Sequence, residues 1–429
     1  CRLFLFLCWR QLIISQFFWP ENFRINDLAE ELSQRGHEIT VLTGIPNYPS
    51  GRWFKGYSLK SVGSEERNRI KIVRVPVIPR FSSKKWQLAI NYLSFAASAS
   101  FLGFFYCREK YNVIFTYAPS PLTVAIPAVL LKLFKGLPMV IWVQDLWPEV
   151  FKALNVIKSK LFFSSVESMM KWIYKHSNMI LVQSKNFIDP VIKIGAQKER
   201  VLYFPNWAEE LYKPIKLDSS SEEVKELKAI AKDNFVAMFA GNLGAAQSLE
   251  TIVDAAENLR SEPLTWIILG DGRRRNWLER EIRKRNLQGT IHLLGPKPVQ
   301  NMPYYFSSAD VLLVTLQSHP VMSSWIPGKV QSYLASAKPI IGALDGAGAS
   351  VIEESGAGFS VKAGDSSALS KKVLQLSKMS EHARVEMGKS ALNYYNEEFN
   401  RKKLVSNLEK YFFNLTKKSN KELSFITLF

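Results

Sequence analysis

Short runs of apolar, often β-branched residues alternate with helix-patterned segments along nearly all of this chain of 429 residues. Apolar residues at helical spacing separate the runs at the intervals typical of βαβ units. The alternation predicts an α/β fold with parallel, doubly wound sheets, and the chain is too long for a single core. The strand-like runs are residues 38–43, 70–77, 113–116, 139–142 and 179–182 in the first half, and 235–240, 264–269, 290–294, 311–315 and 339–342 in the second.

The two sets of runs indicate two α/β domains in tandem. Pro205, Asn206 and Pro214 mark a linker between them, because composition shifts there and proline interrupts both patterns. A first strand is expected to begin at Leu12. The expected parts are an upstream extension or mis-set start (1–11), an N-terminal domain (12–205), a C-terminal domain (206–383), a long amphipathic helix that can cross back to the N-terminal domain (384–413), and a tail (414–429).

Positive charge is concentrated in the first half of the chain. Residues 1–205 hold 27 Lys and Arg against 13 Asp and Glu, whereas residues 206–429 hold 29 against 25. This balance favours an anionic partner for the N-terminal domain: phospholipid headgroups, a pyrophosphate-linked substrate or nucleic acid. The alternative is an ordinary solvated surface. The three cysteines have no metal-type spacing, so neither a zinc site nor a disulfide framework is expected.

One uncharged stretch of 22 residues, Trp86 to Cys107, lies between basic residues on both sides. Its length approaches that of a transmembrane helix. Gln87, Asn91 and three serines interrupt it, and its apolar residues encircle the helix. Three interpretations stay open at this stage: a buried or half-buried helix that packs on a sheet, a helix that dips into a membrane surface, and a spanning helix, which would split one domain across the bilayer.

Glycine turns follow several predicted strands of the second half and suggest a phosphate-bearing ligand. Residues 241–244 read GNLG and residues 270–272 read GDG. Pro327 and Gly328 place Lys329 at the start of a short helix, where a lysine opposes the helix dipole and so needs another reason to be present. Free backbone N–H groups at such helix starts favour an anion at the carboxyl ends of parallel strands.

Six segments in order carry a family resemblance. They are RGHEITVLTG (35–44), FAGNLGAAQSLETIVDAAENL (239–259), ILGDGRRRNWLE (268–279), LLGPKP (293–298), SSADVLLV (307–314) and PGKVQSYLASAKPII (327–341). Together they resemble the bacterial family-four retaining glycosyltransferases of the GT-B fold. The similarity is to the branch that builds O-antigen, capsule and exopolysaccharide, including N-acetyl-L-fucosaminyl transferase-like members. It implies two tandem Rossmann-like domains with an interdomain cleft.

The resemblance also implies an activity. A sugar passes from a UDP-sugar donor to a lipid-pyrophosphate-linked saccharide acceptor, on a peripheral enzyme at the cytoplasmic face of the plasma membrane. The chemistry needs no metal and no other cofactor, because basic side chains and helix starts neutralise the leaving diphosphate. Two alternatives remain: a nucleotide-sugar epimerase of the same fold, and a degenerate membrane-bound nucleotide-sugar binding protein. A nucleic-acid binder would explain the charge but not the glycine turns.

The donor residues implied by the resemblance lie in the C-terminal domain. Asn242 and Gln247 stand where many members carry Arg or Lys, and Ser324 and Ser332 stand where many carry glutamates. Lys329 is therefore the expected cation for the diphosphate. The predicted donor-binding residues are Gly241, Asn242, Gly244, Gly272, Arg273, Lys329 and Ser332.

In the N-terminal domain, Asp145 follows a predicted buried strand and matches the family position near the sugar ring. It could orient a sugar hydroxyl or stabilise charge at the anomeric carbon, or it could cap the helix that follows. Glu21 is the second predicted catalytic residue, and His37 is expected to be structural. The predicted acceptor-binding residues are Asn22, Arg24, Asn47 and Tyr48.

Overall fold

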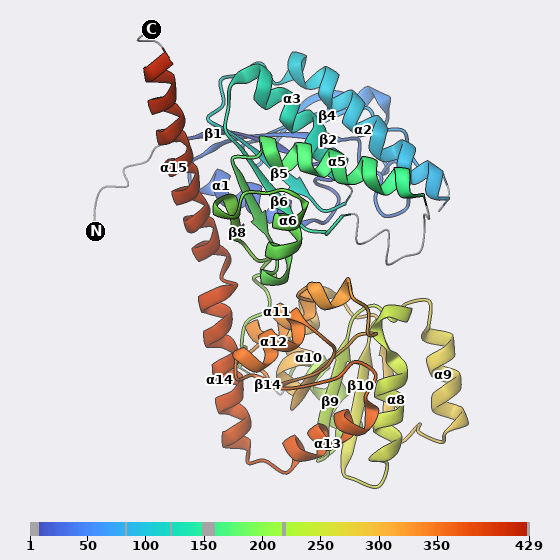
Figure 1. Cartoon of the computed structure of the whole chain (residues 1–429). Coiled ribbons are helices and arrows are strands. Elements are labelled where there is room, and N and C mark those ends of the chain that lie inside the picture. Colours follow the sequence, from blue (N-terminus) through green and yellow to red (C-terminus); the bar gives the residue numbers. More distant parts are fainter. Residues whose placement is uncertain (1–7, 82–83, 121, 148–158, 217–219, 427–429) are drawn as a thin grey trace. The chain divides into compact units, whose positions relative to one another are not determined.

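The computed structural model describes residues 8–81, 84–120, 122–147, 159–216 and 220–426. The chain forms two compact units (Figure 1). Unit 1 comprises Cys1–Phe204 together with Lys402–Phe429, and unit 2 comprises Pro205–Arg401. Unit 1 is therefore built from both ends of the chain, whereas unit 2 is continuous in sequence.

A mixed sheet forms the centre of unit 1. Among the described residues its eight strands have the order β3-β4-β2-β1-β5-β6-β7-β8, and every neighbouring pair except β3 with β4 is parallel. The antiparallel edge strand β3 corrects the expectation of a purely parallel sheet. The strands are β1 (Arg10–Ile14), β2 (Glu38–Gly44), β3 (Gly63–Arg67), β4 (Ile70–Val75), β5 (Val113–Ala118), β6 (Met139–Val143), β7 (Met179–Val182) and β8 (Val201–Tyr203).

The helices of unit 1 pack on this sheet through apolar residues at helical spacing. In the first of them, Leu28, Ala29 and Leu32 are buried, and Gly36 follows the helix at a φ of 92°, which favours glycine. The helices are α1 (Arg24–Gln34), α2 (Lys85–Tyr106), α3 (Ala125–Lys135), α5 (Lys160–His176), α6 (Ile188–Ile194) and α15 (Arg401–Ile426).

The first strand begins earlier than the sequence predicted. β1 starts at Arg10, which is in register with Glu38 of β2, and Trp9 is buried against the ring of His37. Residues 9–11 are therefore part of unit 1, and the prediction of an upstream extension through residue 11 is wrong for them. The sequence did not indicate this start, because Arg10, a charged residue at the exposed amino end of β1, interrupts the apolar run. Residues 1–7 lie outside the described part of the chain.

Unit 2 contains a fully parallel sheet with apolar clusters on both faces. Its order is β11-β10-β9-β12-β13-β14. The strands are β9 (Phe235–Ala240), β10 (Leu264–Leu269), β11 (Ile291–Gly295), β12 (Val311–Thr315), β13 (Ile340–Ala343) and β14 (Gly358–Val361). The helices are α7 (Glu222–Ala231), α8 (Leu249–Asn258), α9 (Arg275–Lys284), α10 (Met302–Ser308), α11 (Gly328–Ala335), α12 (Ala347–Glu354), α13 (Ser366–Ser377) and α14 (Glu381–Glu398). The predicted pair of α/β domains with parallel sheets is confirmed.

The C-terminal helix differs from the prediction in two ways. In place of one helix over 384–413 there are two, because the chain leaves the helical path at Phe399, whose ring is buried in the core of unit 2, and Asn400. Asparagine at such a break favours the start of a new helix. The second helix, α15, continues to Ile426, so the predicted tail over 414–429 is helical through most of its length.

Helix α15 packs against the rest of unit 1 from Lys402 onward. Arg35 donates to Glu409 at 2.8 Å, and Nε2 of His37 lies 2.8 Å from the other oxygen of the same carboxylate. The ring of Phe412 meets those of Trp9 and Phe115 edge-on, with centroids 5.8 and 6.1 Å away. The end of the chain therefore closes an apolar surface at the first strand.

Candidate functional site

Two glycine turns interlock at the carboxyl ends of β9 and β10. A Cβ on Gly270 would lie 1.9 Å from the carbonyl oxygen of Gly241, and one on Gly272 would lie 2.6 Å from that of Leu243. The N–H of Leu243 donates to the carbonyl of Asp271 at 2.8 Å. Only glycine fits these positions, so backbone approaches backbone here more closely than side chains allow.

Lys329 extends into this pair of turns from the second residue of α11. Its Nζ donates to Oε1 of Gln247 and lies 3.7 Å from the centroid of the Phe239 ring. A Cβ on Gly241 would lie 2.5 Å from Cε of Lys329, and the φ of Gly241 is 142°. The glycine therefore makes room for the lysine, and the structure brings together two predicted donor-binding residues from distant parts of the chain.

The charge of Lys329 is not matched by a carboxylate. Burial lowers the pKa of Lys329 to about 7. Among the described residues it forms no ion pair, and its hydrogen-bond partner Gln247 is a neutral amide. Its position at the start of α11 adds the positive end of a helix dipole. An anion bound beside Lys329 would offset the cost of burying the cation, and a diphosphate fits this requirement.

The arginine run after Gly272 separates into different roles. Arg274 pairs with Glu250, and Arg275 contacts Glu279 through Nε at 3.0 Å. Arg273 is exposed, and it has no ion pair within the residues that the structure describes. Arg273 is therefore the arginine of the three whose charge is available to a ligand, and its contact with the donor stays a prediction.

Two further predicted donor residues are placed differently. The side chain of Asn242 is exposed and covers Gly244, so that a Cβ on Gly244 would lie 3.1 Å from its Nδ2. The hydroxyl of Ser332 donates to the carbonyl of Gly328 at 3.1 Å inside α11, and Ser332 is buried. The geometry gives Ser332 a partner within its own helix, and its contact with a ribose stays a prediction.

In unit 1, Asp145 lies just beyond β6 and forms a hydrogen bond with Ser120, which follows β5. Burial raises the pKa of Asp145 to about 7, and the hydrogen bond to Ser120 partly opposes that shift. A carboxyl group near half-ionisation at neutral pH suits proton exchange or charge stabilisation. Residues 148–158, where the alternative helix cap would be tested, lie outside the described residues.

Two tyrosines connect Asp145 with predicted acceptor residues. Tyr117, at the end of β5, lies within electrostatic range of Asp145 and Arg24, and burial raises its pKa. Tyr92, on α2, lies within range of Asp145 and Tyr48, and burial raises its pKa to about 12. Sequence reasoning missed both tyrosines. The signal for Tyr117 was its place at a strand end, whereas a mid-helix tyrosine such as Tyr92 gives no signal.

Glu21 holds a loop rather than facing an open site. The side chain is only 2% exposed. One oxygen accepts from the N–H groups of Asn47 and Tyr48 at 2.8 and 2.7 Å, and the other accepts from Phe18 at 3.2 Å. Burial raises the pKa of Glu21 to about 7, although these three N–H groups favour its charged form. A catalytic role for Glu21 stays a prediction that this geometry does not favour.

The remaining predicted acceptor residues are also distributed unequally. The amide of Asn47 is buried and bonds to Asn91 at 3.2 Å and to the carbonyl of Ile45 at 2.9 Å, so it supports the loop. Tyr48 is exposed, and Asn22, which follows Glu21 in the first strand-to-helix turn, is exposed as well. Tyr48 and Asn22 are thus available to a ligand, while Asn47 sets the loop that carries Tyr48.

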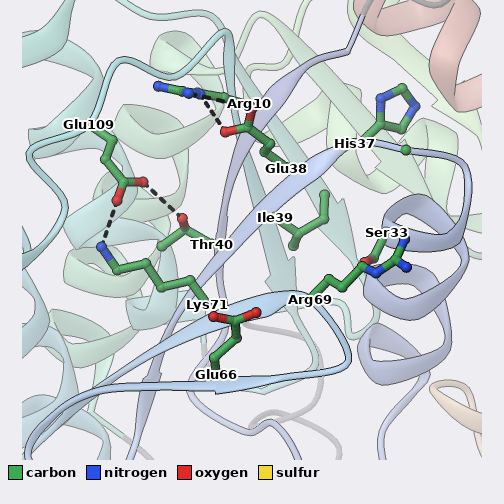
Figure 2. A pocket seen from close by; sticks show the side chains of 11 residues that line it. Arg10, Ser33, His37, Glu38, Ile39, Thr40, Glu66, Arg69, Lys71 and Glu109 are labelled. Atoms are coloured by element: carbon green, nitrogen blue, oxygen red, sulfur yellow. Dashed lines mark hydrogen bonds and ion pairs between the residues drawn. The ribbon is translucent and has the colours of Figure 1, made fainter.

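A separate cavity of about 460 Å³ lies at the amino ends of β1, β2 and β4 (Figure 2). Its charged groups are mostly paired with each other: Arg10 with Glu38, and Lys71 with Glu109 at 2.6 Å. The cavity lies at the end of the sheet opposite to Asp145. His37, which also lines it, contacts Glu409 of the C-terminal helix, as a structural residue would.

No metal cluster accompanies the candidate residues of unit 1 or those of unit 2 in the part of the chain that the structure describes. No three His, Cys, Asp or Glu side chains there are grouped so that they could hold a metal ion.

Comparisons with known proteins agree with this architecture. Residues 22–207 match the family described as glycosyl transferase 4-like domain, and residues 220–393 match glycosyl transferases group 1. WcaI of Escherichia coli K12, named as a glycosyl transferase of colanic acid biosynthesis, is 25% identical over 314 residues, which cover 72% of this chain and 76% of WcaI.

Two solved structures share the fold over nearly the whole chain. HepE from Anabaena, in complex with UDP and glucose, is 15% identical with a TM-score of 0.65, and the match covers 95% of this chain and 100% of HepE. WaaG, a glycosyltransferase involved in lipopolysaccharide biosynthesis, is 14% identical with a TM-score of 0.64, covering 95% of this chain and 99% of WaaG.

The two α/β units, each built on a mostly parallel sheet, have the GT-B fold of these structures. The chain belongs to the group 1 glycosyltransferases, with a glycosyl transferase 4-like domain in its N-terminal half. The predicted enzyme class and family are confirmed.

Proposed function

We propose that this glycosyltransferase moves a sugar, with retention of anomeric configuration, from a UDP-sugar to a lipid-pyrophosphate-linked saccharide in bacterial polysaccharide synthesis. The observation that carries the donor half is the uncompensated cation of Lys329, packed against Gly241 at the start of α11. The names of WcaI and WaaG support the polysaccharide context, and the bound ligands of HepE support UDP as the nucleotide.

In the donor half, Lys329 and the start of α11 receive the diphosphate. Arg273, exposed after the second glycine turn, supplies a further positive charge. These groups stabilise the negative charge that grows on the leaving UDP as the bond between the anomeric carbon and the diphosphate oxygen breaks. The proposal includes no metal ion, and activity measured with a chelator tests that part.

In the acceptor half, Asp145 stabilises positive charge at the anomeric carbon or orients a sugar hydroxyl. Its raised pKa and its contact with Ser120 support a position shielded from water. Arg24, on the first turn of α1, and the exposed Tyr48 are proposed to contact the acceptor phosphate and saccharide. The excess of basic residues in the first half of the chain suits an enzyme on the inner face of the plasma membrane.

The experiment that tests the proposal is a donor screen. Purified protein is incubated with UDP-, GDP- and TDP-linked sugars and a bacterial lipid extract, and nucleotide release is measured with and without the extract. UDP release that depends on the acceptor supports the proposal, provided that NMR shows the same anomeric configuration for the transferred sugar in the product as in the donor. Release of UDP without acceptor, or conversion of the donor to another sugar, would argue for different chemistry.

A further inference from the structure

Helix α2 carries a continuous apolar stripe on its outer side. Its most exposed members are Trp86 (58% exposed), Leu93 (57%) and Phe101 (66%). Steps of three or four residues place all members on one helix face. The residues of this stripe, called here the α2 stripe, are Trp86, Ile90, Leu93, Ala97, Phe101 and Phe105.

The opposite face of α2 belongs to the core of unit 1. Phe95 and Ala99 are buried, and a Cβ on Gly103 would lie 3.1 Å from Leu42 of β2 and 3.2 Å from Leu131 of α3. α2 is the one helix in the described residues that is long and apolar enough to cross a membrane, yet 28% of its most apolar stretch is buried inside the protein. One face of α2 therefore belongs to the core, and the rest is partly or fully exposed apolar surface.

Neighbouring residues widen the apolar surface beyond α2. Figure 1 shows α3 beside α2, and the ring of Phe134 at the end of α3 meets Phe104 edge-on at 4.9 Å. Phe134 is 73% exposed. Large apolar side chains from two helices thus form one exposed surface. Soluble monomeric proteins rarely expose a contiguous apolar patch of this kind unless it binds a partner.

Basic residues stand at both ends of the stripe. Lys84 precedes α2, and Arg108 and Lys110 follow it, all three exposed. Trp86 and Tyr106 lie near the two ends, where amphipathic rings suit the boundary between headgroups and acyl chains. A second copy of this chain on the same face would bring like charges together, because a two-fold interface repeats the same surface. An anionic lipid surface matches both the charge and the apolar stripe.

We propose that unit 1 docks on an anionic lipid bilayer through the α2 stripe and Phe134, with α2 lying in the plane of the interface. The helix is about 33 Å long, enough to span a bilayer. Spanning would remove its packing on β2 and α3 and the buried hydrogen bond of Asn91 with Gln16 at 2.8 Å. The in-plane orientation keeps these contacts and inserts only the exposed side chains.

The orientation also concerns the acceptor, and this step rests on the proposed function. Tyr92 lies on the face of α2 opposite to the stripe, and it is within electrostatic range of Asp145 and Tyr48. The acceptor half of the site therefore faces the far side of the docked helix, one helix diameter, roughly 10 Å, from the membrane surface. A saccharide whose lipid stays in the bilayer would extend past α2 to reach Asp145.

The test uses the full chain and vesicles of phosphatidylglycerol and phosphatidylethanolamine in equal parts. Wild-type protein should sediment with these vesicles, partly release in high salt, and be extracted by alkaline carbonate. The variants Leu93→Glu and Phe101→Glu should each weaken binding about tenfold or more, because a charge replaces an inserted apolar side chain. Val385→Glu, at an apolar position of unit 2 that is 47% exposed, is the matched control and should bind as wild type.

Several results would overturn the inference. They are equal vesicle binding by the stripe variants and wild type, no binding by wild type, resistance to carbonate, and a dimer in solution that the stripe variants dissociate. UDP binding measured by calorimetry without vesicles is the separate readout for the proposed function. Stripe variants that keep UDP binding but lose vesicle binding support docking, whereas wild type that binds vesicles but not UDP would defeat the proposed function alone.

Discussion

Replacing Lys329 by methionine removes one cation from the glycine-turn cluster while keeping a flexible apolar stem of similar length. The Nζ contact with Gln247 and the position over Phe239 are lost, and Gly241 keeps its room. A charge-assisted contact with a diphosphate contributes about 1.5–3 kcal/mol. We therefore expect UDP affinity to fall by about 10- to 150-fold, as calorimetry would measure.

The pH dependence sharpens this prediction. Because burial lowers the pKa of Lys329 to about 7, Lys329 in the free protein is mostly charged one pH unit below that value and mostly neutral one unit above it. A bound diphosphate favours the charged form, so binding above pH 7 must take up a proton. Each further pH unit then costs about 1.4 kcal/mol, or about tenfold in affinity. The wild-type dissociation constant should rise from pH 7 to pH 9, and that of the methionine variant should stay flat.

A matched control is Lys372→Met on α13, whose Nζ also lies over an aromatic ring, Phe359, at 4.4 Å. Its UDP affinity and pH profile should equal those of the wild type. Unchanged affinity in Lys329→Met, or a wild-type dissociation constant that ignores pH between 7 and 9, would refute the reasoning.

Three more substitutions separate the roles of individual residues. Asp145→Asn should leave UDP affinity nearly unchanged and lower kcat by about tenfold or more, because charge stabilisation is lost; a kcat within a few-fold of wild type would leave Asp145 without a role in the chemistry. Gly241→Ala should displace Lys329 and lower both Tm and UDP affinity, since its Cβ would lie 2.5 Å from the lysine Cε, whereas Gly289→Ala, with nothing within 4 Å, should change neither. At about pH 4.5 and below, where Glu21 is protonated, Glu21→Gln should lower the free energy of unfolding by about 1–3 kcal/mol, because an amide cannot accept all three backbone N–H groups. The raised pKa of Glu21 also means that the folded state binds this proton more tightly than the unfolded state does. The free energy of unfolding of the wild type should therefore fall as the pH rises from about 4.5 to about 7. Denaturation curves of the Gln variant should lack this contribution to the pH dependence.

Features that depend on local periodicity were predictable from the sequence. The strands over 235–240 and 264–269 were found at their observed bounds, and the turns after them were recognised from their glycines. Lys329 was singled out because a lysine at a helix start is electrostatically unfavourable by itself. Its closeness to Gly241 follows from parallel strand order, in which β9 lies beside β12.

Features set by tertiary contacts were not predictable. Arg10 lies in β1, where it forms an ion pair with Glu38 on the neighbouring strand β2. The sequence did not predict this start of the strand, because a charged residue interrupts the apolar run. The break between α14 and α15 at Phe399 depends on the burial of the Phe399 ring in the core of unit 2. The spacing of apolar residues does not predict this burial. From the sequence, Glu21 could have faced either a ligand or its own loop. It faces the loop because three backbone N–H groups donate to its carboxylate, and the sequence does not show that these groups lie close to it.

The discontinuity of unit 1 has a consequence for synthesis. Trp9 and Phe115 both contact Phe412, which leaves the ribosome only when nearly the whole chain has been synthesised. Every residue of unit 2 has already emerged by then. Unit 2 can therefore finish folding first, although it is encoded second. A fragment that stops at Phe204 leaves apolar side chains of the first strand region uncovered, and a useful excised form of unit 1 must carry α15 on a linker.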